Sequence, residues 1–173
     1  MGRNRISFSK EMIDQIHKSD QYIGILKPWV KVSSKPIEED KEYFCVATWG
    51  TFHIMSLPRF MWLTSKVGSE LHGDIHGEHL VGETRQVCTW GFTDIRAETF
   101  TVWHEREHMA AFYKSGAHKT AMTSMDNDID FRVRRCWVKG SDIPSEGDST
   151  STKAFVLRIK SGDFPEAVKA TKD

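Results

Sequence analysis

Residues 43–53 of the chain read YFCVATWGTFH, and this stretch decides the fold. It is rich in β-branched and aromatic residues, which favour a strand. Its apolar side chains occupy both sets of alternating positions, with Phe44 and Val46 in one set and Cys45 and Ala47 in the other. A strand that is apolar on both faces is usually buried on both faces, so we expect cover on each side of it.

The residues after 43–53 predict an amphipathic helix. Ser56 suits an N-cap and Pro58 a first helical turn. Gly73 fits the stop of this helix. The apolar positions at helical spacing are Phe60, Leu63, Val67 and Leu71.

Further along, residues 80–90 and 95–103 read as two strands joined by a turn. Residues 105–125 follow as a second amphipathic helix, and residues 131–139 as another strand. The order from residue 43 is therefore β-α-β-β-α-β, which predicts an α+β protein with a ferredoxin-like antiparallel sheet and helices on one face. A last strand over residues 154–159 and a short terminal helix over residues 164–170 are expected after this unit.

Three segments follow from this order. Residues 1–41 form an N-terminal extension with a short helix after Ser9, residues 42–144 form the ferredoxin-like domain, and residues 145–173 are a C-terminal strand and tail packing on that domain. The sheet face away from the helices also needs cover, since it is expected to carry Trp49, Trp90 and Trp137. A second subunit would supply that cover, so the sequence predicts a homodimer in the form of a dimeric α/β barrel.

Charge and cysteine content narrow the class of protein. The 24 basic and 24 acidic residues balance, which argues against nucleic acid or an anionic membrane as the main partner. A local basic patch stays compatible with this balance, with residues 132–135 as its candidate. The three cysteines lie in apolar, strand-like runs and are expected to be reduced and buried. The first residues hold no apolar stretch long enough for a signal peptide or membrane span, which predicts a cytoplasmic protein.

Two groups of histidines are candidate metal ligands. The run from His104 to His108 matches the zinc-protease pattern HExxH, but it straddles a predicted strand–helix junction, where a charged first helical turn is the simpler interpretation. The loop after the first helix carries His72, His76 and His79 among carboxylates, which could bind a divalent ion or form an ordinary polar surface loop. We assign no metal site from these patterns.

Residues 101–122, TVWHEREHMAAFYKSGAHKTAM, carry a family resemblance. Together with VATWGTFH and VGETRQVCTWGF they resemble the antibiotic-biosynthesis-monooxygenase-type dimeric barrels, especially the spheroidene-monooxygenase-like branch and its uncharacterised relatives. The resemblance covers about residues 42–140. It implies a pocket between the sheet and the two helices. In that superfamily such pockets serve polycyclic substrates oxidised by oxygen without metal or flavin, or haem, or no known substrate.

The place of the aromatic and histidine residues in the predicted elements suggests which of them line the pocket. Trp49, Trp103 and Phe112 are expected to bind a small molecule. His118 and His53 are the candidate catalytic bases, and the alternative for each is a structural histidine hydrogen-bonded to nearby backbone. The haem-degrading members have a Trp and a His where this chain has Phe112 and Met122, so their axial haem ligand is missing. We therefore expect a cofactor-independent monooxygenase acting on an aromatic or polyene substrate. The alternatives are a non-catalytic homodimeric ligand-binding or stress protein, and a haem-binding protein that uses a pocket histidine.

Overall fold

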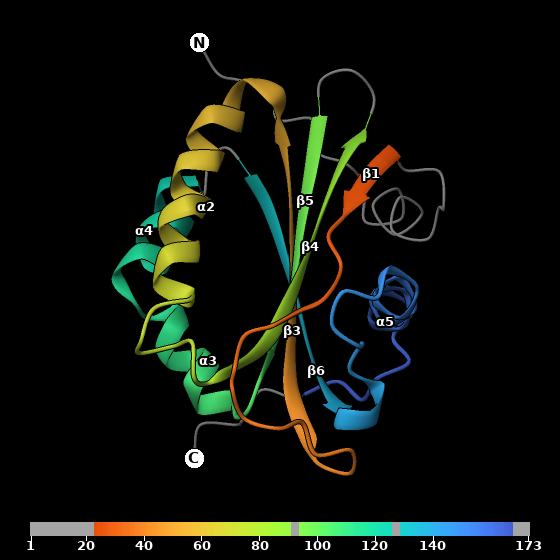
Figure 1. Ribbon diagram of the computed structural model, residues 1–173. Coiled ribbons are helices and arrows are strands. Elements are labelled where there is room, and N and C mark those ends of the chain that lie inside the picture. Colours follow the sequence, from red (N-terminus) through yellow and green to blue (C-terminus); the bar gives the residue numbers. More distant parts are fainter. Residues whose placement is uncertain (1–22, 91–93, 126–128, 168–173) are drawn as a thin grey trace.

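One antiparallel sheet runs through the molecule, with helices on both of its faces (Figure 1). The structure is a computed structural model and describes residues 23–90, 94–125 and 129–167. The sheet order is β1-β4-β5-β3-β6, and β2 also pairs with β4. The strands are β1 (Ile23–Leu26), β2 (Val30–Lys31), β3 (Glu42–His53), β4 (Leu80–Trp90), β5 (Asp94–Trp103) and β6 (Ile129–Lys139).

The central strand β3 confirms the prediction for residues 43–53. It lies between β5 and β6, with Phe44 opposite both Trp103 and Trp137. Its alternate side chains enter separate cores on the two faces of the sheet, as the double apolar pattern indicates. The β-α-β-β-α-β order predicted from residue 43 onward is likewise confirmed.

The helices of the predicted unit cover one face of the sheet (Figure 1). A short 3-10 helix, η1 (Ile54–Ser56), leads into α2 (Leu57–Leu71), which begins and ends as predicted. The second predicted helix is instead two helices, α3 (Arg106–Tyr113) and α4 (Gly116–Met125). At the break, the N–H groups of Lys114 and Ser115 bond to carbonyls three residues back, which tightens the last turn of α3 and ends it.

The opposite face is covered by α5 (Ser149–Ser161), which follows the 3-10 helix η2 (Gly140–Asp142). The strand predicted over residues 154–159 is therefore wrong. Asp148 caps α5 by accepting hydrogen bonds from two backbone N–H groups, and Gly162 ends it with a left-handed φ of 92°. The buried residues of α5 recur at helical spacing, and they are Thr152, Phe155, Val156 and Ile159.

After α5 the chain runs along the edge of β6. The Trp137 N–H donates to the Pro165 carbonyl, and the Ala167 N–H donates to the Arg135 carbonyl. Residues 164–167 are therefore extended and do not start the predicted terminal helix, whose last residues, 168–170, lie outside the described residues.

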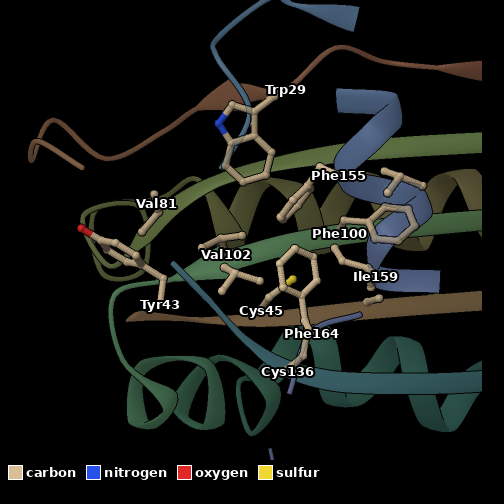
Figure 2. Close-up of a cluster of buried hydrophobic side chains, with 13 residues drawn as sticks. Trp29, Tyr43, Cys45, Val81, Phe100, Val102, Cys136, Phe155, Ile159 and Phe164 are labelled. Carbon is tan, nitrogen blue, oxygen red and sulfur yellow. The ribbon is translucent and has the colours of Figure 1, made fainter. Parts of the chain in front are cut away.

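The cover provided by α5 removes the reason for expecting a second subunit on this face. Figure 2 shows Phe155 and Ile159 of α5 packed toward Phe100 of the sheet. Trp49 packs on this α5 side, whereas Trp137 packs with Phe44 on the side of α2, α3 and α4, so the two do not share a face. The side chain of Trp90 lies outside the described residues.

Part of the N-terminal extension belongs to the sheet. β1 and β2 pair antiparallel with β4, and between them Trp29 is buried in the α5-side core. A Cβ at Gly82 would lie 2.5 Å from the Trp29 ring, so a glycine is needed where this ring crosses β4. The helix predicted after Ser9 lies outside the described residues.

All three cysteines are free and buried, as predicted. Cys45 of β3 and Cys136 of β6 are directly opposite each other in the α5-side core. The Cys45 thiol donates a hydrogen bond to the sulfur of Cys136, and this bond together with burial raises the pKa of Cys45 well above the ordinary value. These thiols act as small apolar groups.

Candidate functional site

The sheet face covered by α2, α3 and α4 carries polar residues between two apolar clusters. One cluster contains Phe44, Val46 and Trp103, and the other contains Phe52 and Ile95 near the far end of β3. Between them the strand register aligns Thr48 with Thr99, Thr99 with Arg85, and Thr101 with Glu83. These five polar residues, here called the polar band, are Thr48, Glu83, Arg85, Thr99 and Thr101. Polar side chains at the centre of an otherwise apolar face need partners, and the helices provide several of them.

Tyr113, the last residue of α3, provides the partner at β3. Its hydroxyl lies 3.0 Å from the Thr48 hydroxyl. Burial raises the pKa of Tyr113, so the phenol stays protonated and can donate a hydrogen bond. This contact fixes the end of α3 against the centre of the sheet.

His118, from the first turns of α4, lies next to Tyr113. Its ring centroid is 4.2 Å from that of Tyr113 and 5.1 Å from that of Phe112. The break between α3 and α4 makes this possible, because it folds α4 back so that His118 meets the last residues of α3. Burial lowers the pKa of His118, so the imidazole is neutral at pH 7 and can accept a proton.

Trp103, at the end of β5, extends this aromatic group. Its ring centroid lies 5.5 Å from that of Phe112, and its indole N–H donates to the Thr101 hydroxyl at 3.0 Å. The structure thus brings together three of the residues singled out in the sequence, Trp103, Phe112 and His118.

Sequence reasoning missed Tyr113 and Thr48 as members of this site. Tyr113 follows Phe112 directly inside the single helix predicted over residues 105–125, and nothing local marks where a helix will break. Thr48 lies on the same strand face as Phe44 and Val46. A lone hydroxyl in such an apolar series is the signal that could have found it.

The other end of the polar band is charged. Arg85 Nη2 lies 2.8 Å from Glu83 Oε1, and His72 Nε2 lies 3.2 Å from the same oxygen. The guanidinium packs under Gly68 of α2, where a Cβ would lie 3.6 Å from Nη2. Glu70 accepts a hydrogen bond from the Ala117 N–H at 2.9 Å, which ties α2 to the start of α4. The band therefore has a neutral hydroxyl end at Thr48, which contacts Tyr113, and an ion-paired end at Arg85.

Two of the predicted site residues lie elsewhere. His53 is exposed at the end of β3, and its Nδ1 accepts a hydrogen bond from the Met55 N–H at 3.2 Å. Trp49 lies on the α5 side of the sheet, beside an open hollow of about 620 Å³ at the edge strand β6. The other residues lining this hollow are Arg132, Val133, Arg134 and Glu166. Neither His53 nor Trp49 is near His118 in the fold, and a shared role in one pocket stays a prediction for them.

The histidines considered as metal ligands have other partners. His72 contacts Glu83, as described above, and the ring of His76 lies edge-on to Phe112 at 5.4 Å. His79 and His108 stack at 3.6 Å between ring centroids. Across the described residues, no group of three or more His, Cys, Asp or Glu side chains is placed to hold a metal ion.

His104, the first residue of the HExxH match, is buried beside the extended lead-in to β3. Its Nε2 lies 3.1 Å from the Ser33 hydroxyl, and its ring contacts that of Tyr43 at 5.7 Å. Burial, reinforced by the charges of Lys35 and Lys41, lowers the pKa of His104 to about 4. The neutral ring therefore holds the lead-in against the start of α3.

Comparison of the sequence with protein-family models and with curated proteins gives no match. Among solved structures, a candidate monooxygenase of Fusobacterium nucleatum is similar at a TM-score of 0.50 and 13% identity, over 66% of this chain and 48% of that chain. A candidate monooxygenase of Lactobacillus acidophilus gives a TM-score of 0.47 at 10% identity, over 65% and 49% of the two chains. An anthrone oxidase-like protein gives 0.46 at 7% identity, over 68% and 56%. This chain thus spans about half the length of the first two proteins, and the likeness to the F. nucleatum structure, with the sheet and helices described above, shows an α+β fold of the ferredoxin-like type.

Proposed function

We propose that the chain binds a small aromatic or polyene molecule between the sheet and helices α3 and α4, and oxidises it with O₂ without a bound cofactor. The observation that carries this proposal is His118, a half-buried neutral imidazole in contact with the rings of Phe112 and Tyr113. The resemblance to solved structures supports the fold alone, so the proposal depends on this group of side chains.

The arrangement suits proton abstraction from an acidic C–H group. A neutral imidazole can act as a general base at pH 7, and burial keeps water from competing for its lone pair. The flat faces of Trp103 and Phe112 would pack against the rings or conjugated bonds of the substrate. The hydroxyls of Thr48 and Tyr113 would orient a substrate oxygen by hydrogen bonding.

The proposed reaction balances with O₂ as the oxidant. His118 takes a proton from a CH₂ group conjugated to the aromatic system, and the resulting carbanion transfers one electron to O₂. The two radicals combine to form a C–O bond, and the imidazolium returns its proton to the terminal oxygen to give a hydroperoxide. His118 then takes the remaining C–H proton as the O–O bond breaks, and passes it to the departing hydroxide, which leaves a ketone and water. The net change is CH₂ plus O₂ to C=O plus water.

The test measures O₂ uptake by the full chain with anthrones and other hydroxylated polycyclic ketones, and with a polyene. Removing a general base lowers turnover about 10²–10⁴-fold, so His118→Gln should lose that much while keeping the wild-type circular dichroism spectrum. His53→Gln is the matched control, because His53 is the other candidate base and lies exposed at the end of β3. Equal turnover by wild type and His118→Gln would remove His118 from the mechanism. Saturable ligand binding without O₂ uptake would favour the non-catalytic ligand-binding alternative.

We also propose that the chain is a homodimer. Since α5 covers the sheet face first expected to be shared, the proposed interface moves to the edge strand β6. Residues 165–167 pair with β6 only near Arg135 and Trp137, and Arg132 and Arg134 border the open hollow. Light scattering should give a mass near twice 19.9 kDa, and a mass of one chain at micromolar concentration would contradict the proposal.

A further inference from the structure

Two of the three cysteines face each other across neighbouring strands. Cys45 of β3 pairs in register with Cys136 of β6, and both side chains are completely buried in the α5-side core. Figure 2 shows both cysteines in this core together with Phe164, which follows α5. Because the Cys45 thiol donates a hydrogen bond to the Cys136 sulfur, the two sulfur atoms are direct neighbours. In the reduced chain they pack as small apolar groups, and their position also suits a bond between them.

The backbone sets the distance between the two cysteines. On β6 the Trp137 N–H and the Arg135 carbonyl point outward, where both bond to the chain that follows α5. Cys136 lies between these two residues, so its own N–H and carbonyl point toward β3, and Cys45 and Cys136 form a hydrogen-bonded pair of the ladder. The Cα atoms of such a pair are about 5.5 Å apart, which is within the usual range for a disulfide. Their Cβ atoms are about 1 Å further apart than a relaxed disulfide prefers, so a bond here would be strained and easily reduced.

The two thiols are not equivalent. The hydrogen bond that Cys136 accepts from Cys45 lowers the pKa of Cys136, and the charge of Arg134 acts in the same direction, against the effect of burial. Arg134 lies two residues before Cys136 on the same face of β6. The thiolate is the form of cysteine that reacts with oxidants. Cys136 is therefore the more reactive thiol, and Cys45 is placed to attack its sulfur afterwards.

Cys136 also lies beside the edge of the sheet. The open hollow of about 620 Å³ at this edge is lined in part by Arg134 and Glu166, and Glu166 forms an isolated bridge with Cys136. Residues 164–167, here called the strap, cover this edge through backbone hydrogen bonds to Arg135 and Trp137. A short segment held by few hydrogen bonds opens locally more often than the core of a sheet. Opening of the strap would let a small oxidant pass from the hollow to the Cys136 sulfur.

We infer that Cys45 and Cys136 form a reversible disulfide when the chain meets a hydroperoxide. The Cys136 thiolate attacks the O–O bond, so that an S–O bond forms, the sulfur is oxidised to a sulfenic acid, and the departing alkoxide takes up the proton that the thiol gave up. The Cys45 sulfur then attacks Cys136. The S–S bond forms, the S–O bond breaks, and the hydroxide leaves as water with the proton of Cys45.

The net change is two thiols and one hydroperoxide to one disulfide, one alcohol and one water. When the hydroperoxide is hydrogen peroxide, the alcohol is a second water. The inference is independent of the proposed oxidation, because the cysteine pair lies on the α5 side of the sheet and His118 on the other.

The test treats the folded full chain with a small molar excess of hydrogen peroxide and then measures intact mass and free thiols under denaturing, non-reducing conditions. Wild type should lose the mass of two hydrogen atoms and two of its three thiols, and dithiothreitol should restore both. Peptide mapping should find Cys45 linked to Cys136. Three surviving thiols, or thiols lost in a form that dithiothreitol does not restore, would overturn the inference.

Two variants separate the roles of the thiols. In Cys45→Ala no disulfide can form, and the sulfenic acid of Cys136 should persist and react with dimedone. Cys136→Ala should keep both of its remaining thiols under the same treatment, because Cys45 then has no reactive neighbour. Each variant removes one buried sulfur atom, and circular dichroism checks that the fold is kept. Dimedone labelling of Cys45 in Cys136→Ala, as fast as that of Cys136 in Cys45→Ala, would contradict the assigned order.

Cys88→Ala is the matched control. Cys88 is also buried in the sheet, at 2% exposed, but its partners in register are Gly24 and Arg96. This variant should form the disulfide at the wild-type rate and keep no free thiol. A failure to form it would mean that Cys88 takes part, and the assigned pair would be wrong.

Phe164→Ala tests the route of the oxidant. Phe164 is 4% exposed and anchors the strap in the α5-side core. Its truncation should favour opening of the strap and speed up disulfide formation about tenfold or more. An unchanged rate would contradict entry past the strap.

Discussion

Acidification from pH 7 to pH 5 should destabilise the chain through His104. The Ser33 hydroxyl donates its one hydrogen to the Glu78 carbonyl at 3.2 Å, so it must accept from His104 Nε2, which lies 3.1 Å away. Nε2 therefore carries the hydrogen of a neutral ring. A second proton would have to enter a buried site near Lys35 and Lys41, which is why the pKa of His104 falls to about 4.

The sign and size of the effect follow from this pKa. The unfolded chain binds a proton at the ordinary pKa of 6.5, whereas the folded chain binds it only near 4. As the pH falls below 6.5, His104 is therefore protonated in the unfolded state before it is protonated in the folded state. The free energy of unfolding falls over this range, until the folded state also takes up the proton near pH 4. The free energy of unfolding should drop by about 2 kcal/mol between pH 7 and pH 5, and by about 3 kcal/mol by pH 4.

The assay is urea unfolding at pH 7 and pH 5, with wild type and His104→Gln compared by the change between the two pH values. The variant should lose about 2 kcal/mol less than wild type over this range. The lowered pKa values of His79 and His118 act in both proteins and largely cancel. His53→Asn is the control, because His53 is exposed in the folded chain too. An equal loss in wild type and His104→Gln would refute the reasoning.

Three further changes test the packing. Glu98 is buried between Arg96 and Lys160, with nitrogen–oxygen distances of 2.5 and 2.6 Å. Glu98→Ala should therefore lower the free energy of unfolding by roughly 3–5 kcal/mol in urea titrations. A loss below about 1 kcal/mol would contradict a buried ion network. Phe155→Ala should lower the free energy of unfolding by about 3–5 kcal/mol. Because it loosens α5 and uncovers the core beneath, it should also increase the mass seen in light scattering. An unchanged unfolding midpoint would mean that α5 does not cover its face of the sheet. Tyr113→Phe removes the hydrogen bond to Thr48 and should lower the free energy of unfolding by about 1 kcal/mol, which thermal unfolding would detect. An unchanged unfolding temperature would show that this hydrogen bond does not stabilise the fold.

Most elements of the ferredoxin-like unit could be predicted because each carries its own periodicity. The double apolar pattern of β3 and the helical spacing of Phe60, Leu63 and Val67 are properties of a few adjacent residues, and the structure forms both as expected. α5 was misread because its apolar run is short. Ala154 to Ile159 fits a period of two as well as a helical period, and length alone does not separate them. The N-cap at Asp148 and the stop at Gly162 were the local signals that favour a helix.

The candidate site was predictable only in part. Trp103, Phe112 and His118 are close in sequence, so a strand end and the helix after it bring them together with little dependence on the rest of the chain. Trp49 could not be assigned in this way. The strand pattern shows which residues share its face, but not which elements cover that face, so its distance from the helix residues of the site depends on the tertiary structure. Tyr113 joined the site because α3 ends there.

By itself, then, the sequence determined which segments form strands and helices from residue 43 to residue 139, except for the break between α3 and α4. It also determined which side chains share a face within each segment, since those depend on local spacing. Only the tertiary structure decided what covers each face. α5 returns from the end of the chain to pack Phe155 against Phe100, although 55 or so positions separate them, and no local pattern encodes that contact. The free energy of burying the α5-side core selects this arrangement, and it thereby assigns Trp49 to one face of the sheet and His118 to the other.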